Sequence, residues 1–257
     1  MIASHTRNRL RRVATPALIC LLTGCSAPAP VAHEQLEHNP RFATLEVLSP
    51  AGPLAGDDLY PFTPGEWVQQ IVYADRIGSP GRQIVHHGSL TDEHGAEFAY
   101  AMGDARTEFW ARDEQGNLVM PATLEHKKQA LSVFDPPLLI AYAELPPGER
   151  RQTQAKMRVL SSTDPSRQRE AGRAVRSIEY VHDERIATPL GEFLAKRIEV
   201  RFTADLTFAD ADKYGTYWVV PGLGVVAQAH EEEIRILGVI SEQNRRSLVL
   251  LQPPHPQ

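Results

Sequence analysis

The sequence predicts an all-β, mainly antiparallel fold with little helix apart from a signal peptide. After about residue 57, many of the 20 prolines and 17 glycines separate short apolar runs, a pattern typical of β proteins. The strongest signal is Leu194–Phe208, where apolar and polar residues alternate over a stretch longer than the usual strand of about 3–10 residues. A period of two predicts one buried and one solvated face, and the length favours a strand that curves with its sheet.

The first 24 residues are predicted to be a signal peptide. Four arginines precede the apolar run Val13–Leu22, which is too short to cross a bilayer because a spanning helix needs about 20 apolar residues. The run ends in Leu22–Cys25 (LTGC), which resembles the bacterial lipobox. The resemblance implies cleavage before Cys25, a diacylglycerol thioether on its sulfur, and an acyl chain such as palmitate on the new amino group. Ordinary cleavage after Ala27 or Ala29 is the alternative.

Residues 25–56 are expected to be the lipidated N-terminus and a flexible tether, because Ser26–Ala32 is rich in proline and alanine. Residues 57–252 are the predicted antiparallel β domain, and 253–257 form a tail. Ser26, rather than aspartate, follows the cysteine, and by the lipoprotein sorting rule this favours the outer membrane, facing the periplasm, over the inner membrane. Two or more acyl chains make a durable membrane anchor.

Charge and cysteine content exclude several classes of function. Removal of the signal takes four arginines and no acid from 27 basic and 32 acidic residues, leaving 23 against 32 and a net charge of −9. Such a surface gives no reason to expect nucleic-acid binding. Cys20 leaves with the signal and Cys25 carries lipid, so we expect no disulfide, cysteine metal site or cysteine nucleophile in the mature domain.

The elements before the long strand follow from turn residues. Glu66–Arg76 is a predicted strand that ends at the turn Gly78–Gly81. Glu108–Met120 predicts a hairpin that turns through Gly116-Asn117. Leu131–Ile140 is expected to bend or to lie at a sheet edge, because it contains Pro136-Pro137.

A strand is predicted at Arg151–Leu160, and a surface loop or short exposed helix at the polar stretch Asp164–Arg173. After the long strand, the apolar runs and short turns predict four more strands: Tyr214–Val220, Val225–His230, Ile234–Ser241 and Ser247–Gln252.

Two histidine groups resemble metal sites but lack the required geometry. His33 and His38 are spaced one residue too far apart for the H-E-x-x-H zinc motif, which needs both on one helix face. His86 and His87 are neighbours on a predicted strand and so point to opposite faces; with His94, they are expected to be exposed. We assign no metal site.

The segment Gly222-x-Gly224-x-x-Ala227 matches a loose dinucleotide fingerprint, with Glu242 about twenty residues downstream. A dinucleotide site also requires further βα units, whereas predicted strands follow here. We therefore interpret Gly222 and Gly224 as turn residues that permit positive φ. No G-x-S-x-G motif occurs, and we assign no catalytic residue and no cofactor.

The segment Tyr217–Val226 (YWVVPGLGVV) resembles one near the end of uncharacterised exported bacterial β-proteins, whose sheet is similar to the half-barrel of the lipoprotein-localisation factors. Tyr60–Phe62 with Gly65–Trp67, and Thr188–Phe193 (TPLGEF), fit the same pattern in order. The resemblance covers Tyr60 to the end in patches. It implies a single curved sheet or half-barrel, no cofactor and no known catalytic residues.

Two classes of function remain open. The first is a membrane-anchored envelope lipoprotein whose non-catalytic β domain binds an apolar ligand or an envelope protein, or has a structural role. Its candidate apolar groove is bordered by Trp67, Leu194, Phe208 and Trp218. The alternative is an envelope hydrolase whose active-site residues meet only in the fold. Acids or histidines converging in one pocket would favour the hydrolase, and an apolar pocket would favour binding.

Overall fold

The computed structural model describes residues 41–59, 94–102, 104–239 and 241–253, together with the backbone of Ile240 and of the strand segments 65–73, 76–77 and 81–87. Within these ranges the chain forms sixteen strands and one α-helix of four residues. None of the described helical segments is long and apolar enough to cross a membrane. In chain order the elements are β1 (Ala43–Leu48), β2 (Leu54–Ala55), α2 (Gly56–Leu59), β3 (Gly65–Tyr73), β4 (Arg76–Ile77), β5 (Gly81–His87), β6 (Phe98–Met102), β7 (Arg106–Arg112), β8 (Leu118–Glu125), β9 (Ala130–Ala141), β10 (Glu144–Leu145), β11 (Arg150–Ser161), β12 (Gln168–Thr188), β13 (Gly191–Leu206), β14 (Ala209–Val220), β15 (Gly224–Ile236) and β16 (Ile240–Gln252).

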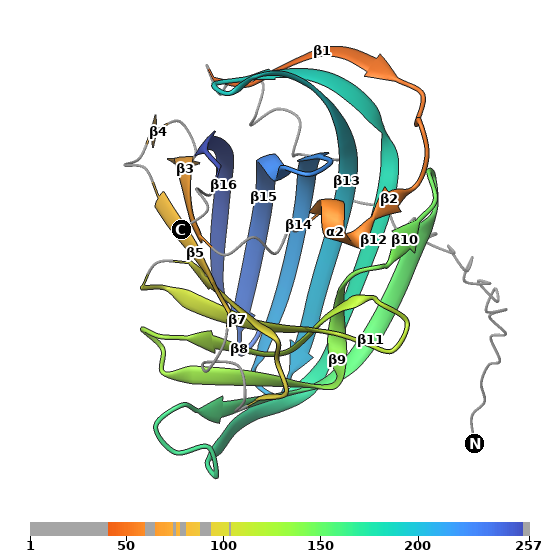
Figure 1. The fold of residues 1–257 in the computed structure, drawn as a ribbon. Coiled ribbons are helices and arrows are strands. Elements are labelled where there is room, and N and C mark those ends of the chain that lie inside the picture. Colours follow the sequence, from red (N-terminus) through yellow and green to blue (C-terminus); the bar gives the residue numbers. More distant parts are fainter. Residues whose placement is uncertain are drawn as a thin grey trace, which may run out of the picture.

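Fourteen strands belong to one antiparallel sheet that curls until it meets itself. Its hydrogen-bonded order is β1-β12-β11-β9-β8-β7-β6-β5-β3-β16-β15-β14-β13, with β4 paired to β3. Strand β12 also pairs with β13, so the path of paired strands returns to β12. The long strands β12–β16 form a strongly curved half-barrel, and β7–β9 cross its concave side (Figure 1). The predicted antiparallel half-barrel with little helix is confirmed.

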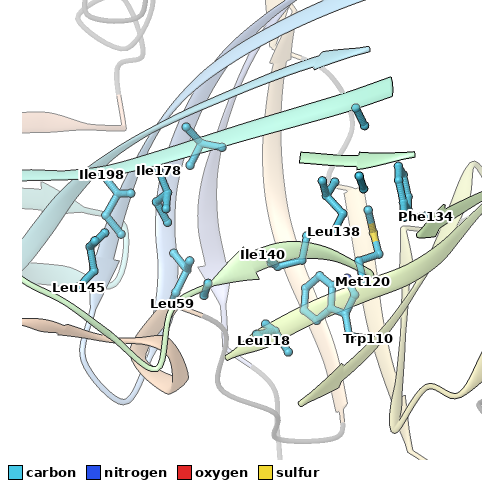
Figure 2. Close-up of a cluster of buried hydrophobic side chains, with 14 of the residues drawn as sticks. Leu59, Trp110, Leu118, Met120, Phe134, Leu138, Ile140, Leu145, Ile178 and Ile198 are labelled. Carbon is cyan, nitrogen blue, oxygen red and sulfur yellow. The ribbon is translucent and has the colours of Figure 1, made fainter. Parts of the chain in front are cut away.

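The space between the long strands and the crossing strands is filled mainly by apolar side chains (Figure 2). Each fully buried aliphatic or aromatic side chain stabilises the fold by about 1.5–3 kcal/mol, so this interior is a major source of stability. Its largest members come from β7, β8, β9, β12 and β13: Trp110, Leu118, Met120, Phe134, Leu138, Ile140, Ile178, Tyr180, Ile198 and Val200.

A small plug closes part of the interior. Strands β2 and β10 pair with each other, and α2 follows β2 and packs against β14 and β15. Leu54, Leu59 and Leu145 from these three elements are buried in the same apolar cluster. Gly56 permits the close approach, because a Cβ there would lie 2.6 Å from the carbonyl oxygen of Tyr142.

The alternation predicted for Leu194–Phe208 is present in β13. Ile198 and Val200 face the interior and are buried, whereas Leu194 and Phe208, near the two ends, are 51% and 54% exposed. The prediction of one continuously solvated face is wrong at the N-terminal end of the strand. There Ala195 is buried in a second cluster, on the outer face of the sheet, because the segment that begins at Phe42 covers it.

Three other predicted strands and turns are confirmed. Strand β9 bends at Pro136-Pro137, where it leaves the ladder with β8; before the bend it pairs with both β8 and β11, and after the bend it pairs with β8. The β7–β8 hairpin turns through Gly116, with φ of 78°. Gly222 and Gly224 have φ of 78° and 84° in the β14–β15 turn, as expected of turn glycines.

Two predictions about local structure are wrong. Gln168–Arg173, expected in a loop or helix, begins the 21-residue strand β12, where backbone pairing to β11 holds polar residues whose side chains face solvent. Ile234–Ser241, expected to be one strand, contains the β15–β16 turn instead. Leu237 and Gly238 adopt positive φ in that turn.

The flexible tether was expected to extend to residue 56, and this too is wrong for its last part. Strand β1 pairs with β12, and the Phe42 ring lies 4.9 Å from that of Trp218 between ring centroids. Leu54 is also buried. The alternating sequence of β1 (ATLEVL) is typical of a strand, so the folded domain begins well before residue 57.

We predict that Ile198→Ala lowers the free energy of unfolding by about 2–5 kcal/mol, because its side chain is fully buried. Phe208→Ala should change it by only about 0.5 kcal/mol, because the ring is largely exposed. Urea unfolding of the chain from Ser26 onward would measure both values. Equal losses in the two variants would contradict the difference in burial between the middle of β13 and its C-terminal end.

Candidate functional site

Two cavities lie inside the curled sheet and share four lining residues. The larger chamber has a volume of about 200 Å³, and the smaller chamber has a volume of about 80 Å³. Arg106 and Glu108 of β7, with Lys213 and Tyr217 of β14, line both. Alternation along each strand explains the arrangement, because residues two apart point to the same face.

The larger chamber has an apolar floor and a charged mouth. Its floor consists of buried side chains from β8, β9, β11 and β13, namely Met120, Phe134, Leu138, Ile140, Met157 and Val200. At its other side the side chains of Arg106 and Glu125 remain 27% and 28% exposed, so this side is reached by solvent. The chamber can therefore receive an apolar group from a polar entrance.

The smaller chamber is more polar. Besides the shared residues, it is lined by Trp110, whose ring stacks on Tyr100 with centroids 4.8 Å apart, and by His230 and Arg246. Gly215 makes room for the shared wall, because a Cβ there would lie 2.8 Å from the ring of Tyr217.

Around the two chambers, the basic side chains outnumber the carboxylates that are available to neutralise their charge. Arg106 is occupied by two carboxylates: its Nε donates to Glu125, and its Nη1 lies 3.5 Å from Glu108. Among the ion pairs of the described residues, none includes Lys213, Arg176 or Arg246. Glu232 is the remaining carboxylate of the larger chamber.

Burial shifts the pKa values of the central groups. Burial, together with the charges of Arg106 and Arg246, lowers the pKa of Lys213 to about 8 against the opposing effect of Glu232 and Glu108. Burial and the same cationic groups, with Lys213, lower the pKa of His230 well below its usual value, so this imidazole is neutral at pH 7. Its Nε2 accepts a hydrogen bond from Nε of Arg246.

The arrangement suits binding better than hydrolysis. His230 has the nitrogen that could act as a base already occupied by Arg246, and two of the three carboxylates are held by Arg106. An apolar floor beside cationic groups instead matches the usual composition of a small-molecule site, which is mostly apolar with a few polar groups that fix orientation.

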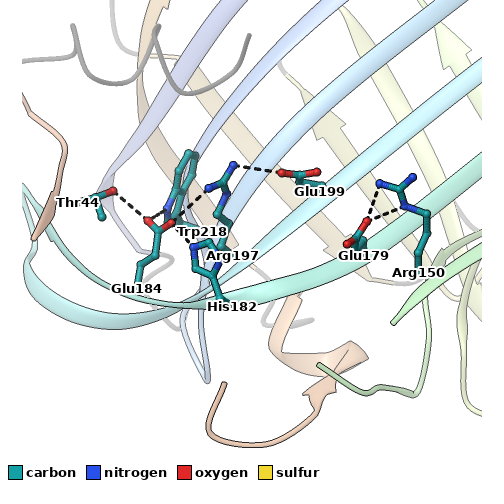
Figure 3. Close-up of polar contacts among 8 residues, drawn as sticks. All are labelled: Thr44, Arg150, Glu179, His182, Glu184, Arg197, Glu199 and Trp218. Carbon is teal, nitrogen blue, oxygen red and sulfur yellow. Dashed lines mark hydrogen bonds and ion pairs between the residues drawn. The ribbon is translucent and has the colours of Figure 1, made fainter. Parts of the chain in front are cut away.

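A separate polar cluster on the outer face fixes the N-terminal segment (Figure 3). The carboxylate of Glu184 on β12 is fully buried and accepts hydrogen bonds from Trp218 Nε1 at 2.7 Å and Thr44 Oγ1 at 2.9 Å. It also contacts His182 at 2.7 Å, and Arg197 lies 3.6 Å away. Glu184 thus joins β1, β12, β13 and β14 at one point.

The hydrogen bonds decide the charge state of Glu184. Burial alone would raise the pKa of its carboxyl group. The bonds from Trp218, His182 and Thr44, with the charge of Arg197, outweigh burial and hold the pKa below its ordinary value.

A second set of contacts fixes the chain just after β1. The amide of Ala51 donates to Asp183 Oδ2 at 2.8 Å, and Lys196 Nζ donates to the carbonyl oxygen of Gly52 at 3.3 Å. Tyr180 connects the two, because its hydroxyl donates to Asp183 and accepts from Lys196.

The four residues predicted to border an apolar groove do not share one location. Trp218 is 1% exposed and packs with Phe42 in the outer-face cluster. Leu194 and Phe208 are exposed near opposite ends of β13. The side chain of Trp67 and the predicted lipidation site Cys25 lie outside the described residues, and the groove stays a prediction.

Sequence reasoning missed the charged residues of the two chambers. The signal that could have found them is a charged residue on the apolar side of a long strand. On β14, Lys213 shares a face with Ala211, Gly215, Tyr217 and Val219. Glu232, within the acidic run Glu231–Glu233 of β15, also lines the larger chamber.

The histidines considered as metal ligands are not brought together in the described part. His94 packs edge-on against Phe109 with ring centroids 4.8 Å apart. The side chains of His86 and His87 lie outside the described residues, as does the stretch with His33 and His38. Within the described ranges, no group of three or more histidine, cysteine, aspartate or glutamate residues is placed to hold a metal ion.

The chain matches no protein-family model, and no curated protein is similar to it in sequence. Three solved structures are similar in fold. The hypothetical lipoprotein YmcC from Escherichia coli is 9% identical with a TM-score of 0.36, over 75% of this chain and 89% of its own. A lipoprotein candidate from Parabacteroides distasonis is 13% identical with a TM-score of 0.34, over 76% and 97%. An exported-protein candidate from Bacteroides fragilis with a YmcC-like fold is 14% identical with a TM-score of 0.36, over 80% and 98%.

We predict that Glu184→Gln lowers the free energy of unfolding at pH 7 by about 2–3 kcal/mol, because it removes the charge that its buried partners stabilise. The folded-state pKa is lowered, so this stabilisation is present above the ordinary value of 4.5 and is lost as the pH falls through the folded-state pKa. The difference between wild type and variant, measured by urea unfolding, should shrink below pH 4.5.

The matched control is Glu46→Gln. Glu46 and Arg185 form an ion pair of 3.2 Å with both side chains about half exposed, and such a pair contributes only about 0–1 kcal/mol. If the two variants lost equal stability, Glu184 would not be the central contact of the outer cluster.

Proposed function

We propose that the protein is a membrane-anchored envelope lipoprotein whose β domain binds a small apolar or amphiphilic ligand inside the curled sheet, without catalysis. The observation that carries the proposal is the larger chamber, because it combines a buried apolar floor with a solvent-reached, charged mouth. Its volume of about 200 Å³ is below the roughly 300–1,000 Å³ typical of drug-sized ligands, which favours a short alkyl chain or a single ring.

The anchor rests on the lipobox Leu22–Cys25 and the charged, apolar signal before it. Lipidation of Cys25 would leave residues 26–40 between the membrane and the first described residue, Arg41. The outer membrane, with the domain in the periplasm, follows from Ser26 after the cysteine.

An envelope hydrolase is the alternative, and one observation favours it. Glu108, Glu232 and His230 all lie around the shared wall of the two chambers. Glu232 is not held by Arg106, whereas His230 or Glu108 could act as a base only after release from its present partner.

The anchor is tested by Cys25→Ser in the full chain. We expect loss of metabolic acyl labelling and accumulation of unprocessed precursor, because the serine hydroxyl cannot form the thioether. Labelling with a fatty acid analogue, followed by mass measurement of the N-terminus, would show both effects. A variant that is still acylated would contradict the lipoprotein assignment.

The cavity is tested by calorimetric titration of 1-octanol into the chain from Ser26 onward, which contains every described residue. We expect saturable binding at one site, and Val200→Phe should weaken it roughly tenfold by filling the larger chamber. Thr123→Met, which fills the same chamber from β8, is the second variant if Val200→Phe does not fold.

The matched control is Phe208→Ala, which removes an exposed ring outside the chambers and should leave octanol binding unchanged. Lack of saturable binding would contradict the proposed function. Binding that is lost in Phe208→Ala but kept in Val200→Phe would place the ligand in the exposed groove instead.

A further inference from the structure

The two chambers differ in polarity, and this difference carries information about the ligand. The floor of the larger chamber is apolar, whereas the wall that both chambers share contains charged groups from β7 and β14. A ligand that fills the floor with an alkyl chain would place its other end at this wall. The chemistry of the wall therefore determines which head group fits.

The wall has more positive than negative charge available to a ligand. Arg106 is already bound by Glu125 and Glu108. Of the groups that remain, Lys213 and Arg246 are cationic and Glu232 is anionic, while His230 is neutral. Arg176, on the larger chamber, adds a further cation and has a buried Nε without a hydrogen-bond partner among the described residues.

Lys213 is the cation best placed to meet a ligand, because it lines both chambers. It takes part in none of the ion pairs of the described residues, and its position between Arg106 and Arg246 is unfavourable for its charge. Lys213 is partly buried, and Glu232 lies opposite it on β15 without forming an ion pair with it, so a bound anion would stabilise the charge of Lys213.

Resting on the proposed function, we propose that the ligand is an amphiphile with a short apolar tail and an anionic head, whose head binds Lys213 with support from Arg246 and Arg176. The tail occupies the larger chamber between β9 and β13, and the head lies at the wall shared with the smaller chamber. The positive charge at the wall then selects among ligands with the same tail.

The head group is tested with three probes that share an octyl chain: octyl sulfate, 1-octanol and octyltrimethylammonium. Each is titrated calorimetrically, below its micelle concentration, into the chain from Ser26 onward at pH 7. We expect octyl sulfate to bind roughly tenfold more tightly than octanol, and the ammonium probe more weakly than octanol. Sulfate is used because its charge is constant over the pH range studied.

Lys213→Met keeps the length of the side chain and removes the charge. It should bring the affinity for octyl sulfate down to that for 1-octanol, with both affinities measured in the same variant. Lys127→Met removes the same charge from an exposed turn and should change neither affinity. If Lys213→Met does not fold, Arg246→Met removes a second cation from the smaller chamber and should reduce the preference in the same direction.

The pH dependence gives an independent readout. The free-protein pKa of Lys213 is about 8, and a bound anion raises it, so binding should weaken as the pH rises through and above 8. The titratable groups around Lys213 are Arg106, Arg246, Glu108, Glu232, His230 and Tyr217; burial raises the pKa of Tyr217 further above this range and lowers that of His230 below it. Arginine and carboxylate side chains ordinarily titrate far from pH 8. The weakening should therefore disappear in Lys213→Met.

The outcomes separate the two proposals. Equal binding of octanol and octyl sulfate, or tighter binding of the ammonium probe, would overturn the anionic head and leave the cavity proposal intact. Failure of all three probes to bind would overturn the proposed function and the head group with it.

Discussion

Strand β12 is hydrogen-bonded along both edges, and the rest of the structure depends on this double pairing. One edge pairs with β11 and β1, and the other pairs with β13 over sixteen residue pairs from Gly172 to Thr188. Because the sheet path returns to β12, the short crossing strands are held against the concave side of the long ones. The interior that results is a packed core with two small chambers rather than an open trough.

The same strand connects the interior to the chain segment that leads toward the predicted anchor. Glu184 and Asp183 on β12 bind Thr44 and the amide of Ala51, which keeps the N-terminal segment on the outer face. A buried carboxylate with several donors contributes stability only while all its partners are present, since any unpaired member leaves a costly buried charge. The N-terminal segment from Phe42 to Ala51 is thus part of the folded domain, and the predicted tether is correspondingly shorter.

Much of the fold could be predicted from the sequence, because alternation and turn residues are local signals. The strand at Leu194–Phe208 and the glycines of the β14–β15 turn are examples. Gln168–Arg173 could not be predicted, because its pairing with β11 depends on backbone hydrogen bonds that need no apolar side chain. The chambers could not be predicted either, because Arg106, Lys213 and His230 are far apart in sequence and meet only where the sheet curls.

The claim that the chambers are the binding site can be tested most directly through the methionines. The chain has four, and after removal of Met1 with the predicted signal the remaining three, Met102, Met120 and Met157, all line a chamber. Methyl-labelled methionine spectra of the chain from Ser26 onward therefore report on the chambers alone, apart from any initiating methionine. Octyl sulfate should shift the signals of Met120 and Met157 saturably, with Met102 following if the head reaches the smaller chamber. Unchanged methionine signals, together with shifted backbone amides at Leu194 or Phe208, would show that the ligand binds outside the sheet.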